Sequence, residues 1–174
     1  MIKVSKYFPA FLLLPALAFW VSCSQQRQLC LTPKTASLTM EMMHKANDTT
    51  TLFTDTALPS AVFIPLTDNP AKRNAFVYTR GSSFAVSLSP DTTMCMWLFA
   101  TDTVSYQSKT IDTITFYYAR QLQFLSNACG YTYFYTLDSV HTSHLMIDSL
   151  HIINTSVTNN VNTKHLQVYI HPGF

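Results

Sequence analysis

The segment YTYFYTL at residues 131–137 places a large apolar side chain at every second position. This period of two is typical of a β-strand that buries one face. The same alternation occurs in four further segments, at residues 37–42, 84–88, 114–118 and 166–170. Because polar breaks such as TSVTNN at 155–160 separate these short segments, the sequence predicts an antiparallel sandwich or barrel. Of the two, we expect a single antiparallel β-sandwich over residues 34–174.

The composition agrees with an all-β domain. The chain has 174 residues, of which 48% are hydrophobic and 11% charged, and this excludes disorder, collagen and coiled coil. Threonine occurs 23 times and glutamate once, at Glu41, so good helix formers are scarce and strand formers abundant. The length suits one domain with a real core.

Residues 94–99, MCMWLF, differ from the other segments because both alternating sets are apolar. We expect this strand to be covered on both faces or to lie where the chain crosses between sheets. Cys95 belongs to this run and is expected to behave as a small core hydrophobe.

The N-terminal residues predict secretion. Two lysines, Lys3 and Lys6, precede an apolar run that ends at Cys23, which is the order of a signal peptide. The sequence WVSC at residues 20–23 resembles a bacterial lipobox, although Trp20 departs from the usual aliphatic residue. We therefore expect residues 1–22 to be a lipoprotein signal peptide and Cys23 to carry the lipid. An ordinary signal peptide cleaved near Ser22 is the alternative.

The residues after Cys23 suggest where the protein lies. Ser24 is not the aspartate that favours the inner membrane in enteric lipoproteins, and residues 24–28 contain no acid. We expect a lipid-anchored, periplasm-facing protein of the outer membrane, with residues 23–33 as a tether. Without the signal peptide, nine basic residues balance nine acidic ones, so we expect no nucleic-acid partner.

Three cysteines remain after lipidation, and an oxidising compartment allows one disulfide among them. Cys30 stands at the head of the domain and Cys129 in a late segment, so a Cys30–Cys129 bridge would join the N-terminus to a late strand. Cys95 fits a bridge less well because of its apolar surroundings. No two cysteines have the spacing of zinc ligands.

Few residues suggest chemistry. The three glycines, Gly81, Gly130 and Gly173, form neither a nucleophile elbow nor a phosphate-binding loop. His141 and His144 could chelate a metal only from a turn, because positions three apart face opposite sides of a strand. We expect solvated loop histidines at 141, 144, 151, 165 and 171. The sequence therefore predicts no catalytic residues, no metal site and no cofactor.

The tyrosine row Tyr131, Tyr133 and Tyr135 allows two interpretations. The rings pack in the core with their hydroxyls at its edge, or they form an exposed aromatic platform; we favour the core. Two functions follow. The first is a binding or accessory module of the cell envelope that contacts another component, such as an outer-membrane β-barrel, through a strand edge or the polar loops at 47–56 and 154–164. The second is a carbohydrate-binding module or a hydrolase of envelope polysaccharide.

The order of several short motifs resembles a known family. These motifs are CLTPK at 30–34, VSLSP at 86–90, DTITFYY at 112–118, SNACGY at 126–131, IDSLHIIN at 147–154 and HLQVYI at 165–170. Together they resemble small envelope lipoproteins of Bacteroidota that are known only as a domain of unknown function. The resemblance implies an envelope location and a β fold, and Cys30 and Cys129 match the family's cysteine pattern. It is weakest at residues 86–88, where the family tends to have Leu-Pro-Leu. It brings no known activity.

Overall fold

A computed structural model describes residues 29–45, 53–55, 57–68, 76–101 and 111–171. The predicted signal peptide, Cys23 and most of the predicted tether lie outside the described residues, as do residues 47–52 and 56 of one predicted binding loop. The chain divides into two compact units, Met1–Cys30 and Leu31–Phe174, and the second contains every strand. Within the described residues, no helix is long and apolar enough to span a membrane.

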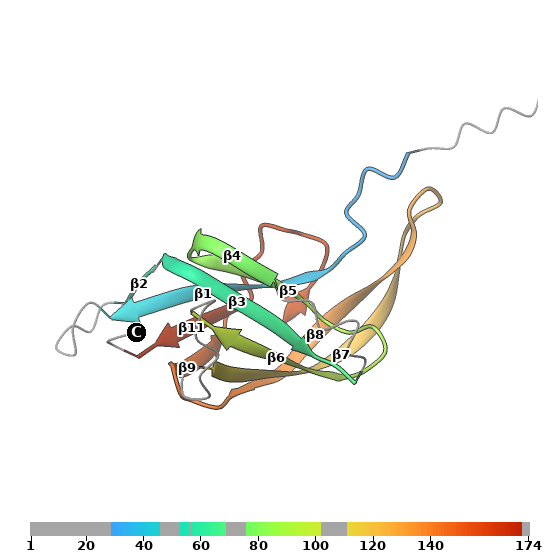
Figure 1. The fold of residues 1–174 in the computed structure, drawn as a ribbon. Coiled ribbons are helices and arrows are strands. Elements are labelled where there is room, and N and C mark those ends of the chain that lie inside the picture. The colour runs from blue at the N-terminus through green and yellow to red at the C-terminus, as the bar shows by residue number, and fades with distance from the viewer. Residues whose placement is uncertain (1–28, 46–52, 56, 69–75, 102–110, 172–174) are drawn as a thin grey trace, which may run out of the picture. The chain divides into compact units, whose positions relative to one another are not determined.

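Two β-sheets make up this second unit (Figure 1). The first has the order β2-β1-β11-β9, with β5 also paired to β1, and its strands are β1 (Ser37–Lys45), β2 (Phe53–Asp55), β5 (Ser83–Ser87), β9 (Ile147–Ile152) and β11 (Leu166–Ile170). The second has the order β10-β8-β7-β6-β3-β4, and its strands are β3 (Leu58–Leu66), β4 (Phe76–Gly81), β6 (Met94–Ala100), β7 (Ile111–Ser126), β8 (Gly130–Thr142) and β10 (Ser156–Val157). The prediction of an all-β sandwich is confirmed.

One strand pair departs from the predicted antiparallel arrangement. β1 pairs with β11 in parallel, with Met40 opposite Leu166 and Met42 opposite Val168. Parallel neighbours need a long crossover connection. Here nearly the whole domain provides it, because β1 and β11 are the first and last strands of the chain. Period-two alternation carries no information on strand direction, so the sequence did not reveal this pair.

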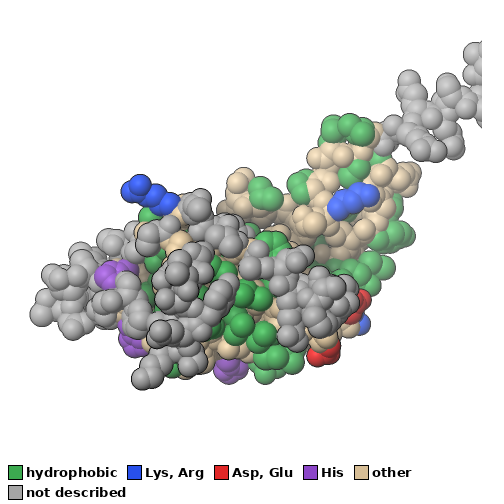
Figure 2. Space-filling view, in the orientation of Figure 1, with side chains coloured by type: hydrophobic (Ala, Val, Ile, Leu, Met, Phe, Trp, Pro, Cys, Tyr) green, Lys and Arg blue, Asp and Glu red, His purple; other side chains and the backbone are tan. Residues whose placement is uncertain are grey.

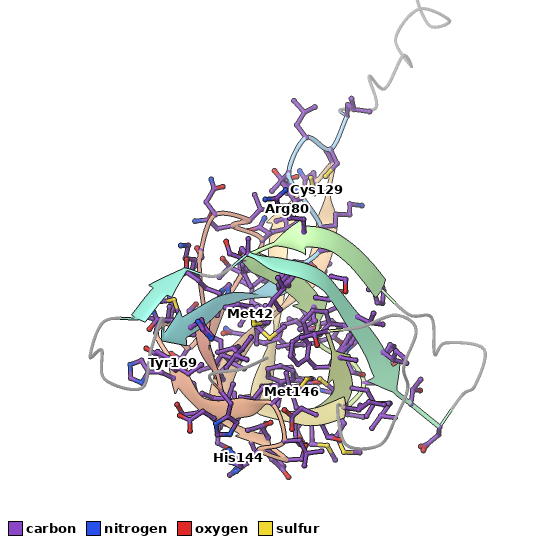
Figure 3. The ribbon with its side chains drawn as sticks, turned by 60° about the vertical axis from the view of Figure 1, so that its left-hand side comes forward. Met42, Arg80, Cys129, His144, Met146 and Tyr169 are labelled. Atoms are coloured by element: carbon purple, nitrogen blue, oxygen red, sulfur yellow. The ribbon has the colours of Figure 1, made fainter. Side chains whose placement is uncertain are left out.

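The core lies between the two sheets and is built from the alternating residues. Met42 and Met146 lie inside it (Figure 3). In β5 every second residue is buried, and β11 buries Leu166, Val168 and Ile170. The largest fully buried apolar side chains come from both sheets: Leu38, Met40, Met42, Phe63, Phe99, Ile114, Phe116, Tyr118, Met146, Ile147 and Leu166.

β3 was missed from the sequence because it contains two prolines. Proline cannot donate a ladder hydrogen bond and is normally excluded from interior strands. β3 tolerates both because its two neighbours are staggered. Among the described pairs, β4 pairs with residues 58–63 and β6 with residues 62–66, so Pro59 and Pro65 each lie where only one neighbour is paired. Each proline therefore occupies a local edge inside the sheet.

The apolar run at 94–99 is an interior strand, β6, between β3 and β7. Its Trp97 and Phe99 are buried toward the core, and on the other face Leu98 is half-buried beside Val62, which is buried. The outer face of the strand is covered only in part, because Met94 is exposed and Met96 is half-buried, and the strand does not cross between the sheets. Cys95 packs partly buried against the core, as predicted.

Candidate functional site

The two longest strands, β7 and β8, run past the rest of the sandwich as a hairpin (Figure 1). β6 pairs with β7 only as far as Tyr117, and β10 pairs with β8 only at Tyr135 and Thr136. Residues 119–126 and 130–134 therefore form a two-stranded ribbon, and within the described part of the chain no strand pairs with its outer edges. We call residues 119–134 the arm.

One face of the arm is apolar. Leu122 lies opposite Tyr133 and Phe124 opposite Tyr131 in the ladder, so all four side chains share a face. Three of them are exposed: Leu122 by 55%, Phe124 by 46% and Tyr131 by 65%. The rings of Phe124 and Tyr131 pack with their centroids 5.1 Å apart. We call Leu122, Phe124, Tyr131 and Tyr133 the apolar arm face. Hydrophobic side chains are visible on the projecting hairpin in Figure 2.

The apolar arm face continues the inner face of the sheet. Tyr118 and Tyr135 belong to the same alternating rows and are buried, whereas Tyr133 is half-buried and Tyr131 exposed. The predicted core packing of the tyrosine row therefore holds at Tyr135 and is wrong at Tyr131. Burial decreases along the row because the opposite sheet ends while the β7–β8 hairpin continues.

Two tyrosines hold a turn at the base of the arm. The Tyr118 hydroxyl accepts a hydrogen bond from the Ser89 N–H at 2.9 Å and donates one to the Ser89 carbonyl at 3.0 Å. The Tyr135 hydroxyl donates to the Leu88 carbonyl at 3.3 Å, and the two rings meet edge to face. Burial raises the pKa of Tyr118 to about 12 and also raises the pKa values of Tyr135 and the free Cys95 thiol. These groups stay protonated at neutral pH, and their bonds fix the base of the arm.

The end of the arm is attached to the N-terminal segment. Cys30 and Cys129 are joined by a disulfide, which confirms the predicted pair, and Cys129 lies in the turn between β7 and β8 (Figure 3). The Thr132 hydroxyl donates a hydrogen bond to the Lys34 carbonyl, and the Asn159 amide donates to the Pro33 carbonyl at 3.1 Å. The last residues of the predicted tether are therefore bound to the domain.

The predicted loop at 154–164 uses its polar side chains locally. Asn154 accepts a hydrogen bond from the Ser156 N–H at 2.8 Å, and Asn160 accepts one from the Asn162 N–H at 3.1 Å. Such contacts stabilise turns. This loop contains the short strand β10.

The described histidines do not form a cluster, and three depart from the prediction of solvated loops: His141 and His151 lie on strands β8 and β9, and His165 is buried. His165 is fully buried. Its ring Nδ1 accepts a hydrogen bond from the Thr39 backbone N–H at 3.0 Å, and the His165 backbone N–H donates one to the Thr39 carbonyl at 2.9 Å. Nε2 lies toward the Ser156 backbone without a hydrogen bond of normal geometry. Burial lowers the pKa of His165.

The remaining histidines are at least partly exposed. His141 lies on β8 with its ring edge-on to Tyr117, and His144 lies in the following turn, where its Nδ1 is 2.8 Å from the Asp148 carbonyl oxygen. Among the described residues, no group of three or more His, Cys, Asp or Glu side chains could hold a metal ion.

Asp112 is a buried polar residue that sequence reasoning missed. Its Oδ1 accepts hydrogen bonds from the Ser143 hydroxyl at 2.6 Å and the Leu145 N–H at 2.8 Å. Its Oδ2 accepts from the N–H groups of Met146 and Ile147, both at 2.7 Å. The carboxylate accepts hydrogen bonds from the donors of the turn between β8 and β9 and of the first residue of β9. Its role in this structure is to hold that turn to β7.

Leu122 and Phe124 were also missed, although the sequence contains their signal. Alternation in β7 does not stop at Tyr118 but continues through Leu122 and Phe124, with Arg120 interrupting the apolar row. A strand of 16 residues exceeds the common length of 3–10 residues. Such a long strand signals that part of it leaves the core.

The described chain is thus an all-β sandwich with a projecting hairpin whose turn is disulfide-bonded to the N-terminal segment. Residues 62–170 match DUF6452, a family of unknown function, and the chain belongs to this family. The match begins within β3 and includes the whole arm, Asp112 and His165. No curated protein and no solved structure matches the chain.

Proposed function

We propose that this protein is a lipid-anchored lipoprotein of the outer membrane, facing the periplasm, and that its β-sandwich is a binding or accessory module of the cell envelope. The signal-like residues 1–22 and the lipobox-like WVSC support the anchor at Cys23. The resemblance of the sequence to Bacteroidota lipoproteins supports the envelope location.

The arm is the observation that carries this proposal. A two-stranded ribbon is at best marginally stable by itself, and exposed apolar patches are typical of contact surfaces. Here the ribbon carries three exposed apolar residues side by side, and it is attached to the N-terminal segment by a disulfide and by a hydrogen bond from Thr132. We infer that the arm is the surface through which the domain meets another envelope component.

Binding accounts for the polar core better than catalysis does. Among the described residues, three carboxylate or imidazole side chains are buried: Glu41, Asp112 and His165. Glu41 pairs with Lys164, and Asp112 and His165 bond to backbone groups that join distant strands or turns. A general acid or base must instead reach a substrate. We therefore propose that the protein acts without catalysis.

Among protein partners, we propose an outer-membrane β-barrel. A lipid on Cys23 keeps the domain near the membrane, where such proteins are close at hand. The outer edges of the arm are unpaired among the described residues, and an unpaired strand edge can accept a further strand through main-chain hydrogen bonds.

Carbohydrate binding is the alternative, and the exposure of Tyr131 favours it. Sugars stack on exposed aromatic rings, but a sugar site also needs polar groups around the ring. The nearest neighbour of Tyr131 on its face is Phe124, and Leu122 follows. This apolar setting makes carbohydrate the second choice.

The test is site-specific photo-crosslinking in whole cells. A photo-reactive phenylalanine analogue replaces Phe124 on the apolar arm face or, as a matched control, Leu145 in the turn between β8 and β9. The two residues are similarly exposed, by 46% and 43%. We expect covalent adducts with an envelope component, protein or lipid, from position 124 and none from position 145. Equal adducts from both positions, or none from either, would contradict the proposal.

A further inference from the structure

The arm is almost free of charge. Residues 119–134 include one charged residue, Arg120, and no acid. The Arg120 side chain lies at the base of the arm, where it donates a hydrogen bond to the Pro90 carbonyl. The far half of the arm carries Phe124 and Tyr131 on one face and Gln123 with Thr132 on the other. The far half of the arm is therefore amphipathic across its two faces, with aromatic rings near its end.

The covalent structure ties this end to the proposed lipid. Cys23 and Cys30 are seven residues apart, so an extended chain separates their Cα atoms by at most about 25 Å. The disulfide adds about 6 Å between the Cα atoms of Cys30 and Cys129. Tyr131 follows Cys129 by two residues. The apolar arm face can thus reach the membrane surface. Whatever conformation residues 23–29 adopt, the Cα atoms of Cys23 and Cys30 cannot lie farther apart than the extended length given above.

We propose that the apolar arm face lies in the headgroup region of the leaflet that carries the lipid of Cys23, as a second contact between the domain and the bilayer. This inference rests on the proposed lipid anchor and on the arm as the contact surface. Its occupant is the lipid surface itself. With the lipid and the apolar arm face both at the membrane, the domain keeps one orientation, and the outer strand edges of the arm are left for a membrane-protein partner.

The chemistry of the face favours lipid over a protein groove or a sugar. Tyrosine is enriched at membrane interfaces, because its ring is apolar while its hydroxyl reaches water. The absence of acidic side chains from residues 119–134 avoids repulsion from phosphate groups. The opposite face carries Gln121, Gln123 and Thr132, which suit water, beside Phe134, which is partly buried against the core.

Tryptophan fluorescence in lipid vesicles tests this contact. The lipidated protein is reconstituted in phosphatidylethanolamine and phosphatidylglycerol vesicles with or without bromine on the acyl chains, which quenches nearby tryptophan. Tyr131→Trp and Phe124→Trp place the probe on the apolar arm face, and Gln121→Trp places it on the opposite face of the same strand pair. Trp97 is buried in the core and its signal is subtracted using the unchanged protein.

We expect bromine to cause a loss of emission and the bilayer to cause a blue shift for Tyr131→Trp and Phe124→Trp, with neither for Gln121→Trp. Equal quenching of both faces would overturn the inference, because it would reflect nearness to the lipid anchor alone. Absence of quenching at positions 124 and 131 would overturn it as well. Two face variants are used so that a folding defect in one does not decide the result.

The outcomes also separate this inference from the proposed function. A protein adduct at position 124 in cells, without quenching by brominated lipid, would overturn the membrane contact and leave the binding module in place. Quenching confined to the apolar arm face, with lipid adducts at position 124, supports both. If the protein gives no adducts and no quenching, both the membrane contact and the proposed function are overturned.

Discussion

Asp112 shows how one buried carboxylate can organise a turn. It lies at the start of β7 and is fully buried, and it accepts four hydrogen bonds from the turn between β8 and β9. That turn includes His144 at φ = 58°, a left-handed conformation that is uncommon for residues other than glycine. Charge-assisted bonds to backbone N–H groups are stronger than neutral ones, and they stabilise the turn in this conformation.

Replacing the carboxylate tests this role. Asp112→Asn keeps the shape but sets an NH2 group against backbone N–H donors, so we expect a loss of about 2–3 kcal/mol in the free energy of unfolding. Urea denaturation of the variant measures it. Asp138→Asn, at an exposed aspartate, is the control and should change little. An Asp112→Asn protein as stable as the unchanged one would show that the turn does not depend on the charge.

His165 makes the stability of the sandwich depend on pH. Its Nδ1 accepts the Thr39 N–H, so protonation of this nitrogen would place two N–H groups against each other. In the folded protein, burial lowers the pKa of His165 below its value of about 6.5 in the unfolded chain, so the unfolded chain binds the proton more readily. Stability is therefore highest above about pH 6.5 and falls as the pH drops below it.

The prediction is a lower urea midpoint at pH 5 than at pH 7.5, with part of this difference due to His165. His165→Asn should lower stability at pH 7.5, because it opens a cavity, but should reduce the dependence on pH. His151→Asn, at an exposed histidine, should leave the dependence unchanged. If the His165→Asn protein keeps the full pH dependence, another group causes it.

At the scale of elements, the arm is supported by less packing than the strand segments between the two sheets, because three residues of its apolar face are exposed. Beyond Tyr118 and Tyr135, Tyr133 and Phe134 still pack partly against the core, and Arg120 bonds to the Pro90 carbonyl. The rest of the ribbon is held by its own ladder, by the Cys30–Cys129 disulfide and by the Thr132 bond to the N-terminal segment. Gly130, at φ = 73°, allows the chain to turn back into β8. The attachment limits the freedom of a hairpin that would be marginal alone.

Removal of the disulfide measures this attachment. The two cysteines are 99 positions apart, and closing such a loop stabilises a fold by at most about 4–5 kcal/mol in the chain-entropy model. We expect the double variant Cys30→Ser, Cys129→Ser to lose stability up to this value in urea denaturation. Amide hydrogens of the arm should also exchange faster than those of the β1–β11 pair.

Cys95→Ala, which removes the free thiol, is the control for the disulfide variant. It should lower stability less and leave exchange in the arm unchanged. Equal protection of the arm with and without the disulfide would show that the hydrogen bonds to residues 33 and 34 are sufficient.

For the molecule as a whole, the proposed anchor would determine which neighbours the domain can meet. A domain freed from the membrane would diffuse through the periplasm, whereas a lipid on Cys23 would confine it to one surface. Stable anchoring generally needs more than one membrane signal. The apolar arm face would supply a further contact beside the lipid.

The anchor is tested by Cys23→Ser. We expect the variant to move from the membrane fraction to the soluble fraction and to change its mobility on a gel, because it lacks the acyl chains. Ser22→Thr, which leaves the cysteine in place, is the control and should stay with the membrane. A Cys23→Ser protein that remains fully membrane-bound with unchanged mobility would exclude lipidation at this residue.

The sequence alone determined the all-β class, the positions of several strands and the disulfide. Period-two alternation follows from which side of a strand is buried, so β1, β5, β7, β8 and β11 could be located from it. The pairing of Cys30 with Cys129 followed from the apolar surroundings of Cys95 and from the family resemblance. The alternation is a local property of the chain, whereas the pairing of the cysteines needed the resemblance as well.

Only the tertiary structure decided which alternating residues are covered. Tyr131 and Tyr135 have the same place in the sequence pattern, yet one is exposed and the other buried, because coverage depends on where the opposite sheet ends. The parallel β1–β11 pair and the burial of Asp112 and His165 depend likewise on partners from distant segments. Alternation within one strand carries no information about what lies across from it, so these features belong to the folded molecule.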